Sequence, residues 1–255
     1  MFDFSGKVVL VTGGAEKAGK YFAECYARGG ADLVITHYRI PEKAEETRKE
    51  IEAMGRRCLA VEADNGSIPD LQMLVRTIEK EYGRLDVILH NASNFNCGPI
   101  EEVSESMWDS SMNLILKGPF FLCQAAAPLM LKHGGGKMVA IIGNSYYENW
   151  PDYIPHSIAK IGLAKLMQML AVAFSPNIQC NAVCPASFLS SGLGDAIMKG
   201  KGEALDPASG TIEVSGIRIH RGCKEEVAEM LMFLSSCSSY VNGAVIPIDG
   251  GKNLI

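Results

Sequence analysis

Three side chains that can transfer protons lie within one short stretch, at Tyr153, His156 and Lys160. Residues three and four apart are neighbours on the surface of an α-helix, so a helix through this stretch would bring the three groups near one face. The imidazole of a histidine titrates near neutral pH, where proton transfer to or from a substrate works best. The stretch therefore predicts a catalytic site for proton transfer.

A glycine-rich segment near the N-terminus predicts the partner of that site. Residues 10–19 follow a short apolar run and precede an amphipathic stretch, so they form a turn between a strand and a helix. Such a turn presents backbone N–H groups and a helix N-terminus to the pyrophosphate of a dinucleotide. The predicted cofactor-binding residues here are Thr12, Gly13, Lys17, Ala18 and Gly19.

The end of the second predicted strand indicates which dinucleotide is bound. Proteins specific for NAD usually carry a carboxylate there for the ribose hydroxyls, whereas this chain has His37, Tyr38 and Arg39. With Lys17 in the glycine-rich turn, Arg39 would place positive charge beside a 2′-phosphate. The pattern favours NADP(H).

Short apolar runs alternate with amphipathic stretches along the whole chain. This alternation predicts an α/β fold, a single doubly wound parallel sheet of the Rossmann type in a three-layer α/β/α arrangement, formed by one domain over residues 1–255. We expect strands at 8–11, 33–36, 57–61, 87–89, 137–142, 178–183 and 244–248, and helices at 18–29, 41–54, 67–82, 104–132, 155–174 and 224–237. Residues 187–221 are rich in glycine and lack a steady period, which predicts a substrate lid.

Composition excludes several classes of function. The 255 residues carry a net charge of −5 with scattered basic residues, so we expect no nucleic-acid partner and no membrane surface. The first ten residues are too short and acidic for a signal peptide, and no apolar run is expected to reach transmembrane length, which predicts a cytoplasmic protein. The eight cysteines are predicted to be reduced, and Cys180 and Cys184 have no further ligands nearby that would make a metal site.

Further motifs resemble those of the short-chain dehydrogenase/reductase family over nearly the whole chain. The glycine-rich turn resembles the family's cofactor loop, and the C-terminal segment 242–251 its last signature. The resemblance implies an adenine contact for Asp64, a nicotinamide-ribose contact for Lys160, a proton-relay role for Asn113, and further cofactor contacts for Asn91, Ala92, Ser93, Pro185 and Ala186.

Two positions depart from the family pattern. The catalytic tyrosine of the family normally lies four residues before the lysine, where this chain has His156. The usual serine, thirteen residues before that tyrosine, is replaced by Gly143. The two groups that ordinarily bind and protonate a carbonyl oxygen are therefore missing, while Lys160 and Asn113 are retained.

Three alternatives for the proton donor follow. His156 could replace the tyrosine directly. Tyr153 lies seven residues before Lys160, a spacing that resembles enoyl-acyl-carrier-protein reductases, and would hydrogen-bond the enolate formed when a conjugated C=C is reduced. Tyr146 or Tyr147 could serve instead, as in the 2,4-dienoyl-CoA reductases, which use an upstream tyrosine.

The segments around residues 12–17, 37–39 and 91–95 also resemble pteridine reductases. That resemblance implies a substrate-stacking role for Phe95 and a place for Tyr153 in the wall of the site. The predicted substrate-side residues are thus Phe95, Gly143, Tyr146, Tyr147 and Tyr153.

These observations predict an NADP(H)-dependent oxidoreductase that reduces a carbonyl, or oxidises the corresponding alcohol, of a small cytoplasmic metabolite. One alternative is an enoyl-thioester reductase that uses Tyr153 and Lys160, and another is a catalytically inactive NADP-binding regulator. Apolar residues on more than one face of the helices near 104–132 and 155–174, together with the family resemblance, predict a homo-oligomer, either a dimer or a homotetramer.

Overall fold

A seven-stranded parallel sheet forms the centre of the computed structural model, which describes residues 2–186, 204–206 and 210–255. The strand order is β10-β6-β5-β4-β1-β2-β3. The strands are β1 (Val8–Val11), β2 (Asp32–His37), β3 (Cys58–Glu62), β4 (Val87–His90), β5 (Gly136–Ile141), β6 (Ile178–Pro185) and β10 (Val245–Ile248). The order reverses beside β1, which is where a doubly wound sheet binds its ligand.

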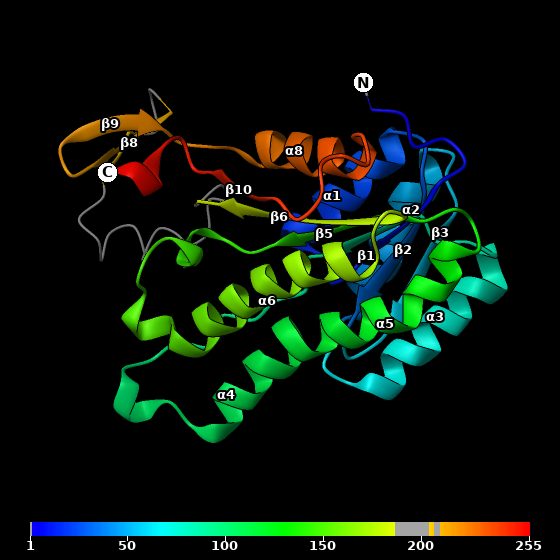
Figure 1. Cartoon of the computed structure of the whole chain (residues 1–255), viewed down its shortest axis with the longest axis horizontal. Helices are drawn as coiled ribbons and strands as arrows, with labels where there is room; N and C mark the ends of the chain where they lie inside the picture. Colours follow the sequence, from blue (N-terminus) through cyan, green and yellow to red (C-terminus); the bar gives the residue numbers. More distant parts are fainter. Residues whose placement is uncertain (1, 187–203, 207–209) are drawn as a thin grey trace.

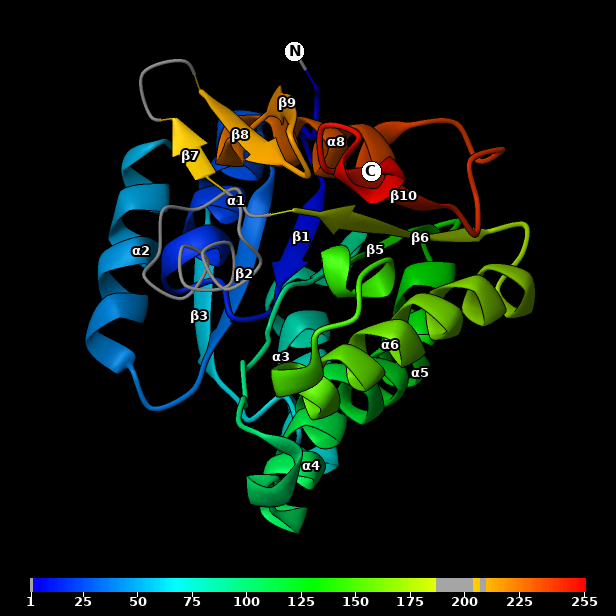
Figure 2. The same cartoon turned by 90° about the vertical axis from the view of Figure 1, so that its left-hand side faces the viewer.

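Helices cover both faces of the sheet, as Figures 1 and 2 show. One face packs on α1 (Lys17–Arg28), α2 (Pro41–Ala53) and α8 (Lys224–Ser236), with Phe22 and Leu231 fully buried between the layers. The other face packs on α3 (Ile68–Tyr82), α5 (Gly118–Leu131) and α6 (Ile154–Ala173). The strands are apolar because both faces are covered, and the predicted three-layer α/β/α fold is confirmed.

The predicted helix over 104–132 contains a π-helical segment that the sequence pattern did not indicate. Ser104 accepts a hydrogen bond from the N–H of Met107 at 3.2 Å and so caps α4 (Glu105–Ser111). A π-helical segment, η2 (Met112–Lys117), then joins α4 to α5. Such π segments insert a residue into a helix and are frequent at functional sites, and this one carries Asn113.

The continuous helix Glu105–Leu131 is long and apolar enough to cross a membrane, by length and composition alone. The expectation that no apolar run reaches that length is therefore wrong. Half of its most apolar window is buried in the protein, where Ile115 and Leu122 belong to the core beneath the sheet. Core helices of globular proteins pass the same test.

A small antiparallel sheet was not predicted. Its strands are β7 (Ala204–Asp206), β8 (Thr211–Val214) and β9 (Ile217–His220), joined in the order β7-β8-β9. It lies beside the C-terminal segment, and a Cβ atom on Gly250 would come within 2.5 Å of the carbonyl oxygen of His220. Residues 187–203 and 207–209 of the predicted lid lie outside the described residues.

Candidate active site

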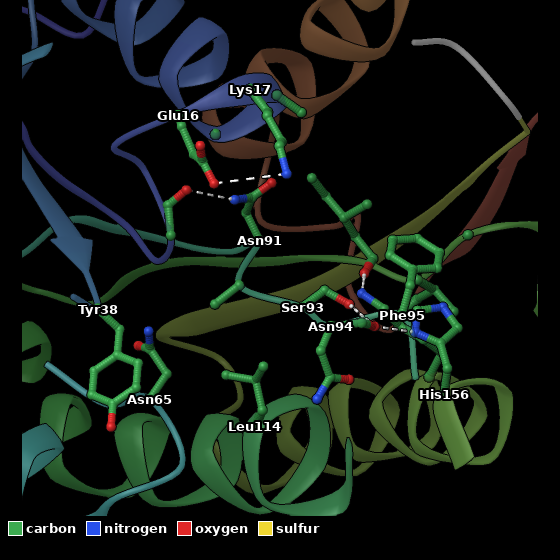
Figure 3. A pocket seen from close by; sticks show the side chains of 18 of the residues that line it. Glu16, Lys17, Tyr38, Asn65, Asn91, Ser93, Asn94, Phe95, Leu114 and His156 are labelled. Carbon is green, nitrogen blue, oxygen red and sulfur yellow. Dashed lines mark hydrogen bonds and ion pairs between the residues drawn. The ribbon is translucent and has the colours of Figure 1, made fainter. Parts of the chain in front are cut away.

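A cavity of about 850 Å³ opens at the carboxyl ends of β1, β2, β4, β5 and β6. The glycine-rich turn and the end of β2 form one end of it, and His156 and Lys160 of α6 form the other. Figure 3 shows Tyr38 and Asn65 on one side of the cavity, with Phe95 and His156 on the opposite side. The volume is in the range of small-molecule and cofactor sites.

The glycine-rich turn has the geometry that a pyrophosphate requires. Gly13 has a φ of +63°, and a Cβ atom on Gly19 would lie 2.1 Å from the carbonyl oxygen of Gly13. Glu16, the N-cap of α1, makes no side-chain capping hydrogen bond, so the first N–H groups of the helix have no such partner. Gly13, Lys17, Ala18 and Gly19 all line the cavity, and these residues fit a dinucleotide.

Thr12, which was predicted to bind the cofactor, is not part of the cavity wall. Its hydroxyl oxygen accepts hydrogen bonds from the N–H groups of Asn91 and Ala92, both at 3.0 Å, and Thr12 does not line the cavity. Asn91 in turn donates from Nδ2 to the carbonyl oxygen of Thr12 at 2.9 Å. Thr12 therefore holds the turn after β4 in place, while Asn91, Ala92 and Ser93 form part of the cavity wall.

The end of the cavity beside β2, where the predicted dinucleotide would place its adenosine, is called the adenosine end and carries both signs of charge. His37 and Tyr38 line the cavity, whereas Arg39 lies over the ring of Tyr38 at 4.7 Å and does not line it. Glu16, which sequence reasoning missed, also lines the cavity and forms ion pairs with Lys17, at 3.7 Å, and with Lys43. The hydrogen bond from Lys43 is the main cause of a lowered pKa for the Glu16 carboxyl. Asp64 lines the cavity, as predicted, next to the unpredicted Asn65.

The end of the cavity opposite the glycine-rich turn, called the reacting end, is formed by helix α6. Of Tyr153, His156 and Lys160, which were predicted to meet there, only two do so. His156 and Lys160 line the cavity and are 2% and 4% exposed. Tyr153 lies before the helix, in the short 3-10 turn η4 (Pro151–Tyr153), and is absent from the cavity wall. The prediction that all three share a helical face is wrong because α6 begins at Ile154, so Tyr153 does not have helical geometry relative to His156.

His156 is held in one orientation by three contacts. Its Nδ1 lies 2.7 Å from the carbonyl oxygen of Asn94, visible in Figure 3. Its ring stacks on Phe95, with centroids 4.4 Å apart, and lies parallel to the indole of Trp150 at 6.4 Å. Burial, and then the charge of Lys160, lower the pKa of the imidazole to about 4.

The loop after β4 positions the acceptor for His156. The amide of Asn94 donates to the hydroxyl oxygen of Ser110 at 2.9 Å, and its Oδ1 accepts from Ser111 at 3.2 Å. Both serines belong to α4. The helix that carries Asn113 therefore also fixes the carbonyl group to which His156 is bound.

Lys160 lies one helical turn beyond His156. Its Nζ donates to the carbonyl oxygen of Ile141, at the end of β5, over 2.6 Å. Burial lowers the pKa of the amine to about 8. Asn113 also lines the cavity, and its Oδ1 accepts from Lys117 at 3.4 Å.

The remaining substrate-side predictions divide into two groups. Phe95 and Gly143 line the cavity, and Gly143 has a φ of +102°, which disfavours any residue with a Cβ atom. Tyr146 and Tyr147 pack edge to face against each other at 4.9 Å and do not line it. Among the described residues, Tyr38 is the only tyrosine in the cavity wall, at the adenosine end.

Sequence reasoning also missed a buried polar network at this end. Glu148 accepts hydrogen bonds from Asn144 and, at 2.9 Å, from the indole N–H of Trp150, and pairs with Lys252 at 3.2 Å. Lys252 follows the C-terminal signature directly, which is the one signal that could have located it. Other missed residues in the wall are Ala15, Thr36, Ile40, Gly66, Asn94, Ser110, Leu114, Ile141 and Ile142.

Comparison with known proteins identifies the family. The sequence model of a family described as enoyl-(acyl carrier protein) reductase matches residues 14–253. A Thermotoga maritima oxidoreductase is 32% identical over 99% of this chain and 100% of its own length. This chain belongs to the short-chain dehydrogenase/reductase family. Pro185 and Ala186, at the end of β6, lie in the cavity wall where the family resemblance implies cofactor contacts.

Two other relatives have named substrates. The NAD-dependent glycerol dehydrogenase of Listeria innocua is 30% identical over 99% of this chain and 96% of its own length. The L-rhamnose 1-dehydrogenase (NAD(P)+) of a Sphingomonas species is 30% identical over 96% of both chains. The protein is accordingly an oxidoreductase of the short-chain dehydrogenase/reductase type.

Solved structures share the fold along the whole chain. A short-chain dehydrogenase of Burkholderia cenocepacia in complex with NADP has a TM-score of 0.84 and 26% identity, covering 98% of this chain and 99% of the other. The acetoin dehydrogenase of Enterobacter cloacae has a TM-score of 0.82 and 26% identity, covering 98% and 96%. Together with the glycine-rich turn, these likenesses indicate a pyridine nucleotide cofactor.

Proposed function

We propose that the protein is an NADP(H)-dependent oxidoreductase that interconverts a carbonyl and an alcohol on a small polyhydroxylated metabolite. The observation that carries this proposal is the position of His156 and Lys160, which face one cavity with a dinucleotide turn at its other end. The bound nicotinamide would supply or accept hydride, and the residues of α6 would bind the substrate and manage its proton.

The polar wall of the reacting end supports a substrate rich in hydroxyl groups. Asn94, Asn144 and Lys252 line this region together with the aromatic rings of Phe95 and Trp150. Amide and ammonium groups bind hydroxyl oxygens, and the aromatic faces cover C–H surface. Glycerol, rhamnose and acetoin, named for the relatives above, all carry oxygens on neighbouring carbons.

Charge at the adenosine end supports NADP(H) over NAD(H). No carboxylate follows β2, the Lys17 side chain is 79% exposed beside the cavity, and the carboxylate of Glu16 is paired with Lys17 and Lys43. A 2′-phosphate would be attracted to these lysines and to Arg39.

The proposal is tested by following nicotinamide absorbance at 340 nm (the wavelength where the reduced cofactor absorbs) with purified protein. The substrates are glycerol, L-rhamnose and acetoin, with cyclohexanol as a control that lacks a second hydroxyl. Turnover with NADP+ or NADPH on a hydroxylated substrate, and far less on cyclohexanol, is expected. Tight NADPH binding without turnover on any substrate would instead support the regulator alternative.

A second function is favoured by the description of the matching family, enoyl-(acyl carrier protein) reductase. In that case crotonyl-CoA would be reduced with NADPH, and Tyr153→Phe would abolish the reaction. The position of Tyr153 outside the cavity wall argues against this function. Crotonyl-CoA reduction that survives in His156→Phe and is lost in Tyr153→Phe would replace the carbonyl proposal.

Exposed apolar side chains support the predicted homo-oligomer. Trp108 and Phe120 on the long helix are about 40% exposed, as is Ile161 on the neighbouring α6, and Ile158 is more exposed. Apolar helix faces of this kind pack in symmetric interfaces, so a dimer or tetramer remains our expectation. A cytoplasmic location also remains a prediction.

A further inference from the structure

The reacting end of the cavity lacks the proton donor that the family normally uses, and its remaining titratable groups differ in what they can donate. His156, Lys160 and Lys252 are the titratable side chains of this end among the described residues in the cavity wall. Each can be assessed from its contacts.

His156 is arranged as a hydrogen-bond acceptor. The carbonyl oxygen of Asn94 can only accept, so the Nδ1 atom of His156 that lies 2.7 Å from it must carry a hydrogen. In a neutral ring Nε2 then has a lone pair and no hydrogen. A second proton on the ring would place a buried positive charge one helical turn from Lys160, and both burial and that neighbouring charge oppose it. His156 therefore has no proton to give from its free nitrogen.

Lys252 is engaged elsewhere. Its Nζ lies 3.2 Å from the carboxylate of Glu148, and the two side chains are 8% and 16% exposed. A largely buried ion pair of this kind holds its proton, because the carboxylate of Glu148 stabilises the charged form of the Lys252 amine.

Lys160 has the required proton and the required position. Its ammonium group has three hydrogens, and among the described residues its one hydrogen bond, to the carbonyl oxygen of Ile141, uses one of them. It faces the same cavity as Asn113 and His156 and is almost completely buried. Burial disfavours the charged amine, which makes transfer of a proton easier.

We propose that Lys160 is itself the proton donor of carbonyl reduction, and the acceptor in alcohol oxidation, in place of the missing tyrosine. This inference rests on the proposed carbonyl–alcohol function. In reduction, an Nζ–H bond breaks and an O–H bond forms as hydride reaches the carbonyl carbon, so the carbonyl is reduced, the cofactor oxidised and Lys160 left as a neutral amine. A proton taken from solution then restores the Nζ ammonium group, so the complete reduction consumes one proton from the solvent.

The first test is the pH dependence of the two directions. If Lys160 transfers the proton, the rate of reduction stays constant up to the pKa of the amine, about pH 8, and falls above it, whereas the rate of oxidation rises to a plateau above it. If His156 were the donor, reduction would fall tenfold per pH unit from about pH 4 upward, and oxidation would be constant over the same range. That second result would overturn the proposal.

The second test separates binding from proton transfer. Lys160→Arg keeps a positive charge but holds its protons across the accessible pH range, so we expect kcat to fall by about 100-fold or more with the Kd for NADPH, from fluorescence, changed about threefold at most. Lys165→Arg, on the exposed face of the same helix, is the matched control. A Lys160→Arg variant with wild-type kcat would overturn the proposal.

A third measurement does not depend on turnover. The rate at which acetic anhydride labels the Lys160 amine is followed over pH by peptide mass spectrometry, because only the neutral amine reacts. A midpoint near pH 8 supports the proposal, and a midpoint above pH 10 overturns it, even if the wild type uses none of the tested substrates. A protein that uses no substrate but labels near pH 8 would contradict the proposed function alone.

Discussion

Acid should destabilise this protein through His156, and the size of the effect follows from its surroundings. Burial and the charge of Lys160 lower the pKa of its imidazole from 6.5 to about 4. An unfolded chain would bind a proton at His156 below pH 6.5, but the folded chain would not bind it until about pH 4. The free energy of unfolding therefore has its full value above pH 6.5 and decreases as the pH falls toward 4.

The magnitude can be worked out from this interval. One pKa unit corresponds to about 1.4 kcal/mol, so at about pH 5 the single histidine would cost about 2 kcal/mol of stability. His90 is fully enclosed beside the thiol of Cys123, at 3.2 Å, and burial lowers its pKa to about 4 as well. The two histidines together would cost about 4 kcal/mol, which is a large part of the roughly 5 to 15 kcal/mol that stabilises a typical domain.

Urea unfolding, followed by circular dichroism at about pH 7.5 and about pH 5, measures this cost. His156→Phe keeps a flat ring between Phe95 and Trp150, and we expect it to reduce the loss of stability between the two pH values by about 2 kcal/mol. Ser157→Ala, a neighbouring buried position without a charge, is the control and should leave the loss unchanged. If His156→Phe and the wild type lose the same free energy, His156 is not held neutral, and the argument that it cannot donate a proton fails.

Four further predictions concern function, backbone strain and assembly. Tyr153→Phe should change kcat for a carbonyl substrate by less than about threefold, because Tyr153 is outside the cavity wall; a loss of about 100-fold would restore it as the donor. Lys17→Ala combined with Arg39→Ala should raise the Kd for NADPH about tenfold more than that for NADH, as measured by fluorescence, and equal changes would contradict NADP preference. Gly143→Ser should lower the free energy of unfolding by about 1 to 3 kcal/mol, because its φ of +102° strains any side chain although the space is open; unchanged urea unfolding would refute this. Ile161→Glu should shift the protein to smaller species in size-exclusion chromatography with light scattering, whereas an unchanged mass would exclude this face as the interface.

Most of the fold could be predicted from the sequence because hydrophobic periodicity determines it. All seven strands of the large sheet were placed within about two residues of their observed ends, since each is a largely apolar run, and the central strands β1, β4 and β6 are buried on both faces. The sheet β7-β8-β9 was missed because its strands are only three or four residues long and lie in a glycine-rich segment, which as a whole has no steady period. The π-helical segment η2 was missed because a single inserted residue leaves the apolar pattern of a long helix almost unchanged.

The candidate site was predicted less evenly. Most of the predicted residues in the glycine-rich turn and at the strand ends, with the exceptions of Thr12 and Arg39, line the cavity because backbone topology brings them there. Tyr153 was misplaced by the position of one helix start. The roles of Glu16 and Lys252 were missed because nothing in the local sequence indicates their ion pairs with Lys43 and Glu148.

The contact at Gly118 has a consequence for assembly. A Cβ atom there would lie 1.9 Å from the carbonyl oxygen of Asn65, so the long outer helix rests directly on the backbone that lines the adenosine end of the cavity. The helix cannot shift without moving that wall. A second subunit that docks on the exposed side of this helix would thus favour one shape of the nucleotide site. By thermodynamic linkage, bound nucleotide would then change the free energy of subunit association by as much as association changes the free energy of nucleotide binding.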